Sequence, residues 1–133
     1  MIGGVADIEL VPGQAVIVTA DSGSAAYSAV FEDDGDTGYF YALDTRGPDH
    51  RILDTLHVYN VKDVVDRHKP SRVQVVWSPD GLRVVLRING FPHAAFDFAK
   101  ARGYCRTNYP PPSQGGFSSD GHAWSDEVLA FFK

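Results

Sequence analysis

The Asn-Gly pair at residues 89–90 is the feature that most constrains how this chain can fold. Both residues tolerate positive φ, and Asn-Gly between alternating apolar and polar residues is the strongest short signal for a tight β-hairpin. Such alternation continues on both sides of the pair over residues 72–98, and a second turn signal, Ser-Pro-Asp-Gly, occupies residues 78–81. The segment therefore predicts a three-stranded antiparallel meander.

The Asn-Gly turn also predicts which side chains of the meander share a face. A two-residue loop pairs Leu86 with His93, and the same register places His93 and Asp97 on the face that carries Trp77. The remaining residues of that face are apolar, and a slip of one residue would bury two arginines. We therefore expect His93 and Asp97 to lie on the apolar face.

Shorter alternating runs fill most of the remaining chain. They predict a hairpin from residues 8–10 and 15–19, a second hairpin from 27–32 and 39–43, and a strand over 52–59. Helical features occur at residues 60–69, where Asn60 can cap and Pro70 stops the run. The tail at 125–132 fits either one last helical turn or a closing strand. The expected fold is mainly β (α+β): an antiparallel β-meander sheet or sandwich of several short strands with one or two short helices.

The length of 133 residues suits one domain, and no repeat or linker divides the chain. We therefore expect residues 1–133 to form a single globular domain. Residues 104–123 form an irregular Pro/Gly/Ser-rich segment within it, where Tyr109 precedes three prolines that favour an extended polyproline II conformation.

Composition narrows the class of protein. Hydrophobic residues make up 44% of the chain, which indicates a real core, but no apolar run approaches the ~20 residues that span a bilayer. Seventeen acidic against 12 basic residues give a net charge of −5, which argues against nucleic acid as a partner. Cys105 is the single cysteine, so no intrachain disulfide can form, and a cytoplasmic location is expected.

His93 and Asp97 are the sharpest candidates for chemistry. A histidine and a carboxylate on one half-buried face can form an orienting hydrogen bond and shift each other's pKa. Catalysis would also need a nucleophile or metal, and no nearby residue supplies one. The two residues, with Trp77 as a wall, therefore indicate either a ligand pocket or ordinary hydrogen-bonded structural groups.

The loop at residues 33–38 is acidic, with the sequence Asp-Asp-Gly-Asp-Thr-Gly. Its oxygen-bearing residues do not alternate as a calcium loop requires, and no glutamate closes it, so we expect no metal and no cofactor. Asp33, Asp34 and Asp36 concentrate negative charge at a hairpin tip. They predict a contact for a basic protein partner, with Tyr109 as a further contact, or else a solvated turn.

Five motifs together carry a resemblance to a known family. They are Phe-Glu-Asp-Asp-Gly at 31–35, Thr-Gly-Tyr-Phe-Tyr-Ala at 37–42, Trp-Ser-x-Asp-Gly at 77–81, Ile-Asn-Gly-x-x-His-Ala-x-Phe-Asp-Phe at 88–98, and Gly-Tyr-Cys-Arg at 103–106. Through them the chain resembles a small bacterial family, domain of unknown function 2251. The resemblance implies a bacterial setting and supplies no activity or catalytic residue. Some small acidic β-rich bacterial domains are immunity proteins, which is an analogy of size, charge and fold.

The interpretation that we favour from the sequence is a non-enzymatic protein-binding module, because no nucleophile, base and oxyanion site can be assembled. The alternative is a small-ligand-binding protein or minor enzyme with a pocket near His93 and Asp97. A homodimer joined through an edge strand is a third arrangement. A deep cavity at both polar residues would favour the ligand, and an exposed aromatic or acidic patch would favour the partner.

Overall fold

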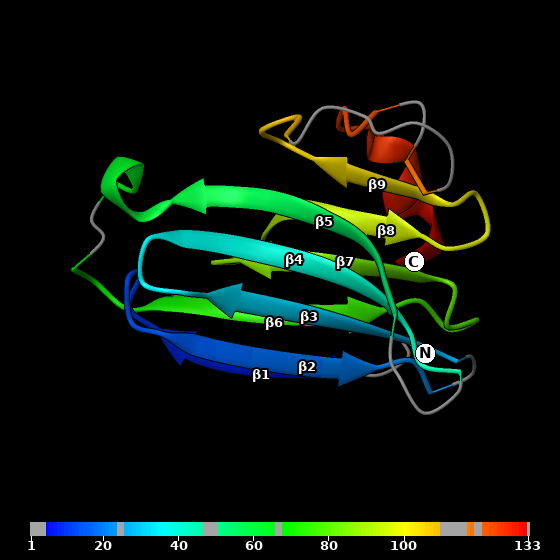
Figure 1. Cartoon of the computed structure of the whole chain (residues 1–133), viewed down its shortest axis with the longest axis horizontal. Coiled ribbons are helices and arrows are strands. Elements are labelled where there is room, and N and C mark those ends of the chain that lie inside the picture. The colour runs from blue at the N-terminus through cyan, green and yellow to red at the C-terminus, as the bar shows by residue number, and fades with distance from the viewer. Residues whose placement is uncertain are drawn as a thin grey trace.

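A computed structural model describes residues 5–23, 26–46, 51–65, 68–109, 117–118 and 121–132 of the chain. They form two antiparallel sheets packed face to face (Figure 1). The five-stranded sheet has the order β1 (Val5–Leu10), β6 (Ser71–Trp77), β7 (Arg83–Ile88), β8 (Phe91–Asp97), β9 (Arg102–Cys105). The four-stranded sheet has the order β2 (Val16–Asp21), β3 (Tyr27–Asp33), β4 (Thr37–Asp44), β5 (Arg51–Asn60). The expected mainly-β fold is confirmed.

The main core lies between the sheets and follows the period-two alternation of their strands. Phe31 and Phe40 of the four-stranded sheet meet Trp77 and Phe96 of the five-stranded sheet, and all four are 0% exposed. The rings of Phe40 and Phe96 stack with centroids 5.0 Å apart. Burial of these large aromatic side chains supplies much of the force that holds the two sheets together.

A smaller core closes the outer side of the five-stranded sheet. The tail forms a 3₁₀ helix, η2 (Asp126–Phe132), whose Val128 is 1% exposed. Val128 packs with Val76, Val85 and Ala95, which point away from the main core. Of the two forms expected for the tail, the structure shows the helical turn and not the closing strand, and this turn packs on the outer surface of the five-stranded sheet.

The meander forms from β6, β7 and β8, but its predicted register is wrong. A register shift follows Leu86, so that Leu86 pairs with Ala94 and Arg87 with Pro92, which leaves His93 as an extra residue. Proline has no N–H to donate, and within sheets it is found at edges and bulges. The bulge turns Asp97 to the side opposite the main core, so the shared face predicted for His93 and Asp97 does not exist.

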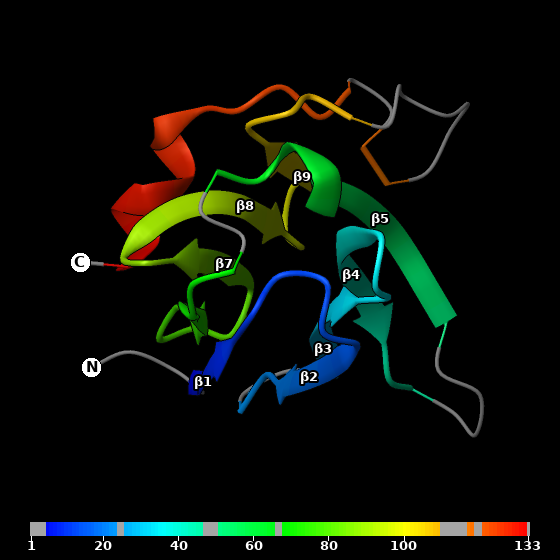
Figure 2. The same cartoon turned by 90° about the vertical axis from the view of Figure 1, so that its left-hand side faces the viewer.

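The second predicted hairpin is confirmed by β3 and β4, whereas the first one is wrong. β1 pairs with β6 and β2 pairs with β3, so the two strands belong to different sheets (Figure 2). The chain crosses the sandwich at Pro12 and Gly13, where Gly13 adopts φ +92°. Leu10 and Val18 both reach the main core from opposite sheets, so the crossing satisfies the same alternation that suggested a hairpin.

The helix predicted at residues 60–69 is reduced to one 3₁₀ turn, η1 (Val61–Asp63). Asn60 makes no side-chain cap, and Val64 is already extended at φ −76°, ψ 124°. Valine is a weak helix former because its branched side chain loses χ1 freedom in a helix. The backbone N–H of Val61 instead donates to the Asp36 carbonyl at 2.8 Å, which ties η1 to the β3–β4 hairpin.

The proline-rich part of residues 104–123 lies outside the described residues, and the single-domain assignment stays a prediction. No described helix is long and apolar enough to cross a membrane.

Candidate functional site

A cleft of about 730 Å³ opens between the two sheets, at the end where η1 lies. The five-stranded sheet contributes Leu10, Val73, Ile88 and His93, and the end of β5 contributes residues 57–60. The rim includes Asp63 and Val64 after η1, together with Thr107 and Tyr109. The lining therefore combines apolar side chains, Leu10, Val58, Val73 and Ile88, with polar groups from β5, β8, η1 and the segment after β9.

Tyr59 forms one wall of the cleft, and its position depends on a glycine. A Cβ atom at Gly38 would lie only 2.6 Å from the Tyr59 ring, so the ring packs directly on the β4 backbone. The Tyr59 hydroxyl donates a hydrogen bond to Asp33 Oδ2 at 2.7 Å. Burial, followed by Asp33, raises the pKa of Tyr59 well above its usual range, so the phenol stays protonated and keeps this bond.

Asp33 is a buried structural group rather than an exposed contact. It is 1% exposed, and its carboxylate accepts the backbone N–H groups of Gly13 at 2.8 Å and Gly35 at 2.9 Å besides the Tyr59 hydroxyl. A carboxylate that is so enclosed cannot contact a protein partner. This corrects the expectation that Asp33 is part of a partner contact. Asp34 and Asp36 of the same loop are exposed, as expected. No group of three metal-binding side chains occurs among the described residues.

His93 reaches the cleft because it is the bulged residue of β8. Burial, and secondarily the positive charge of Arg106, lowers the pKa of His93 below its usual value. The imidazole is therefore neutral near pH 7 and can both donate and accept a hydrogen bond. Phe91 supports it with an edge-on ring contact at 5.4 Å between centroids.

His57 and Tyr109 form the rim on the other side of the cleft. Their rings meet at a steep angle with centroids 5.2 Å apart. The backbone N–H of His57 donates to the Tyr109 carbonyl at 3.1 Å, and the Thr107 hydroxyl donates to the backbone carbonyl of His57 at 2.6 Å. These bonds fix the segment after β9 against β5. Tyr109, predicted as a partner contact, is 53% exposed and lies at this rim.

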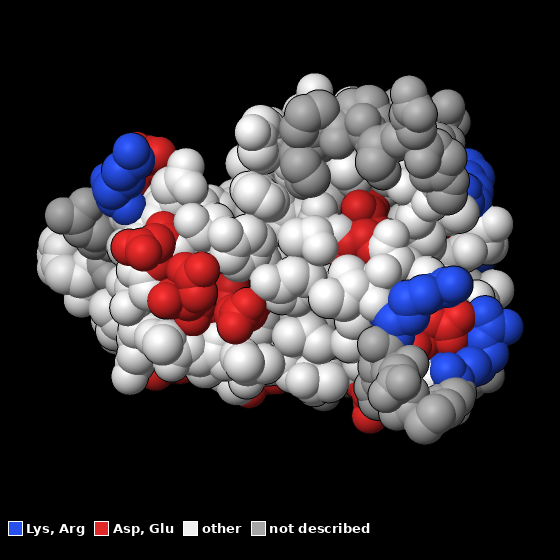
Figure 3. All heavy atoms as spheres, in the orientation of Figure 1, with Lys and Arg blue, Asp and Glu red and all other residues white. Residues whose placement is uncertain are grey.

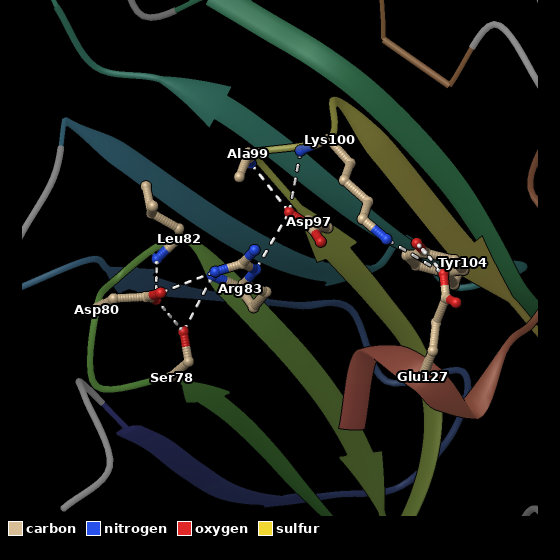
Figure 4. A network of polar contacts seen from close by, with 9 residues as sticks. All are labelled: Ser78, Asp80, Leu82, Arg83, Asp97, Ala99, Lys100, Tyr104 and Glu127. Carbon is tan, nitrogen blue, oxygen red and sulfur yellow. Dashed lines mark hydrogen bonds and ion pairs between the residues drawn. The ribbon is translucent and has the colours of Figure 1, made fainter. Parts of the chain in front are cut away.

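Asp97 and Trp77 do not join His93 in the cleft. Asp97 is 1% exposed and lies on the outer side of the five-stranded sheet, where Arg83 Nε approaches it to 3.2 Å and the N–H groups of Ala99 and Lys100 donate to it (Figure 4). Trp77 is 0% exposed in the main core and donates to the Ala20 carbonyl at 3.1 Å. Of the three residues predicted for a pocket, the structure places His93 alone at the cleft among the described side chains.

A second buried polar cluster joins β5 to the chain after residue 116. Asp54 accepts the Ser118 hydroxyl, and His122 Nε2 lies 3.0 Å from the same carboxylate. The carboxylate stands between serine and histidine, whereas a nucleophilic triad needs the histidine in the middle. This cluster therefore ties Ser118 and His122 to Asp54 of β5. Cys105 is 1% exposed, so its thiol is buried.

His57, Tyr59 and Asp63 line the cleft, although the sequence does not predict them as site residues. They lie on β5 and η1, about thirty positions from His93, and nothing in their spacing links them to it. Gly38 was the available signal, because a glycine inside a strand often marks a close approach.

A family model described as an uncharacterised protein conserved in bacteria, DUF2251, matches residues 10–133, a range that includes every residue lining the cleft. The chain belongs to the DUF2251 family. A relative from Haemophilus influenzae, described as an uncharacterised protein, is 48% identical over 86 residues, or 65% of this chain. The match spans about half of that relative, 53% of its length. No solved structure matches this DUF2251 chain.

Proposed function

We propose that this DUF2251 protein binds a small, mostly apolar molecule in the cleft between its two sheets. The carrying observation is the cleft itself, because about 730 Å³ falls within the ~300–1,000 Å³ of small-molecule sites. Leu10, Val73 and Ile88 provide an apolar base, and His93 adds a polar group able to orient a bound molecule. An apolar interior with few polar groups is typical of ligand sites.

Charge narrows the ligand class. The described lining includes the carboxylate of Asp63 and no lysine or arginine. Arg106 lies near His93, but its guanidinium stacks over Phe91 and Trp124 at 4.7 and 4.0 Å. A neutral or positively charged molecule therefore suits the cleft better than a phosphate or carboxylate.

Binding accounts for this cleft better than catalysis does. The Thr107 hydroxyl at the rim donates to the backbone carbonyl of His57, so its proton is already engaged. A nucleophile needs a base that accepts its proton, and this arrangement does not provide one at Thr107.

The test uses N-phenyl-1-naphthylamine, a neutral apolar dye whose fluorescence rises in apolar surroundings. Wild-type protein should show saturable binding at one site. Val64 lines the cleft, whereas its neighbour Val65 is 87% exposed and does not. Val64→Trp should fill part of the opening and weaken binding about tenfold, and Val65→Trp should leave it within about twofold. Non-saturable binding, or equal affinities of the two variants, would refute ligand binding in the cleft.

A second candidate function, binding of a protein partner, is supported by a different surface. Tyr39 and Tyr41 stack with centroids 5.8 Å apart on the outer side of β4. Tyrosine is enriched in protein interfaces because it offers a large rigid surface with a polar tip. Affinity capture from a bacterial extract should return a partner with wild-type protein that is lost with Tyr39→Ser/Tyr41→Ser. Identical captured proteins with both baits would refute this role of the tyrosines.

A further inference from the structure

The outer surface of the four-stranded sheet carries two rows of side chains that run across its strands. One row follows the pairs Ile17–Glu32, Glu32–Tyr39 and Tyr39–His57, and the next contains Thr19, Val30, Tyr41 and Thr55. Tyr39 stacks on Tyr41 and meets His57 edge-on at 4.9 Å. We call this surface, formed by Ile17, Val30, Glu32, Tyr39, Tyr41 and His57, the tyrosine face.

The two outer surfaces of the sandwich differ in their cover. On the five-stranded sheet, η2 lies over the outward-facing valines and Phe131 stacks on the Arg83 guanidinium at 3.6 Å. On the four-stranded sheet, no described helix or strand lies over the tyrosine face (Figure 2). Ile17 is 64% exposed there. A sheet surface that no described helix or strand covers, and that carries aromatic and β-branched side chains, is typical of an interaction site.

Charge decides which occupant suits this face. Glu32 lies within the first row, and Asp34 and Asp36 are exposed at the β3–β4 end of the same surface, where carboxylates gather in Figure 3. None of the ion pairs between described residues involves these three groups. Arg46 and Arg51 lie at the opposite end of this sheet, where they pair with Asp44. Two copies stacked with their β3–β4 ends together would bring like charges together, which is costly. A basic partner instead places its cations beside the three carboxylates, which is favourable.

We propose, resting on the second candidate function, that the tyrosine face binds a partner protein through an extended segment rich in arginine and lysine. Their aliphatic stems can lie along the tyrosine rings while the cationic heads interact with the ring faces and the three carboxylates. The Tyr41 hydroxyl donates to Glu32 at 2.8 Å, which orients that carboxylate. Arginine is favoured because its planar guanidinium both stacks and binds carboxylates in two-point contacts.

The probe for this proposal is a short synthetic peptide that alternates arginine and threonine, compared with one that alternates glutamate and threonine. Binding is followed by two-dimensional NMR of the full chain. The arginine peptide should shift backbone signals of β3 and β4, and the glutamate peptide should not bind. Shifts confined to the cleft-lining residues, or equal binding of both peptides, would overturn the proposal.

A control variant separates the effect of a local contact on peptide affinity from the effect of the protein's net charge. Glu32→Gln and Glu9→Gln change the net charge equally, but Glu9 lies on β1 of the other sheet. Glu32→Gln should lower the affinity for the arginine peptide about threefold to fivefold, and Glu9→Gln should change this affinity less than about twofold. Tyr39→Ala should also lower the affinity for the arginine peptide, although it leaves the net charge unchanged. Retained dispersion of the NMR signals checks that this variant is folded. Equal effects of the two glutamine variants would reduce the attraction to net charge and overturn the proposal.

The salt dependence of binding distinguishes the proposed basic segment from the second candidate function, binding of a protein partner. If a captured native partner is lost with the tyrosine double variant but its affinity does not fall as salt rises, protein binding stands and the basic segment is refuted. If no captured protein depends on the tyrosines, the second candidate function is itself refuted.

Discussion

The hydroxyl of Tyr59 donates to Oδ2 of Asp33 at 2.7 Å, and this bond connects a wall of the cleft to the β3–β4 hairpin. The same carboxylate accepts N–H groups from Gly13 and Gly35, so it joins two turns and one strand. A buried acceptor with three donors is costly to remove, because each donor is then left without its partner. The acidic loop therefore contains one structural aspartate beside two exposed ones.

This arrangement predicts different effects for the same substitution within one loop. Asp33→Asn should lower the free energy of unfolding by about 1–3 kcal/mol, because an amide NH₂ would face donors. Asp36→Asn, at an exposed position, should change it by less than about 0.5 kcal/mol. Urea denaturation of both variants measures the difference. Equal stabilities would show that the carboxylate of Asp33 is not an anchor.

Trp77 should be among the most costly residues to truncate. It fills the space between the sheets, and its Nε1 donates to the Ala20 carbonyl of the opposite sheet at 3.1 Å. Trp77→Ala should destabilise the domain by about 3–5 kcal/mol. Trp77→Phe should cost less, since it keeps most of the apolar volume and loses the hydrogen bond. Thermal melting that stays within a degree or two of wild type for Trp77→Ala would contradict this placement.

The sequence predicts local features of the fold well and long-range features poorly. The meander was predictable because the turns at residues 78–81 and 89–90 and the alternation around them are local signals. The register failed at Pro92, because the missing N–H favours a bulge that a simple turn rule ignores. β1 and β2 were predicted as strands but assigned to one hairpin, since alternation shows which side is buried but not which sheet a strand joins.

The cleft shows the same limit. His93 was singled out, but its neighbours in space come from β1, β5 and η1, and alternation cannot bring those segments together. Alternation alone assigns Asp97 to the same face as His93, because it does not reveal the extra residue at the bulge. A candidate site made from strand ends of two sheets depends on packing between sheets, which single-sequence patterns do not contain.

The lowered pKa of His93 predicts how stability depends on pH. The unfolded chain binds a proton at His93 near its ordinary pKa of about 6.5, before the folded chain does, so stability is lost as pH falls through that value. His93→Gln removes this contribution, and its stability should fall less than that of wild type between about pH 7.5 and about pH 5.5. Urea denaturation of both proteins at the two pH values tests this. Parallel losses would assign the pH dependence to other groups.

Gly38 gives the most direct test of how the cleft wall is built. Gly38→Ala would place a methyl group 2.6 Å from the Tyr59 ring, so the ring must move and strain its bond to Asp33. We expect a loss of about 1–3 kcal/mol in stability and weaker dye binding, because Tyr59 lines the cleft. Gly23→Ala is the matched control, since nothing lies within 4 Å of a Cβ there.

The contribution of the Tyr59–Asp33 bond can be separated with one more variant. In a Tyr59→Phe background the hydroxyl is already absent, so Gly38→Ala should cost less than it does in wild type. The two single variants, the double variant and wild type form a cycle that urea denaturation can measure. An equal cost of Gly38→Ala in both backgrounds would mean that the ring adjusts without disturbing Asp33, and the wall would then depend on ring packing rather than on the hydrogen bond.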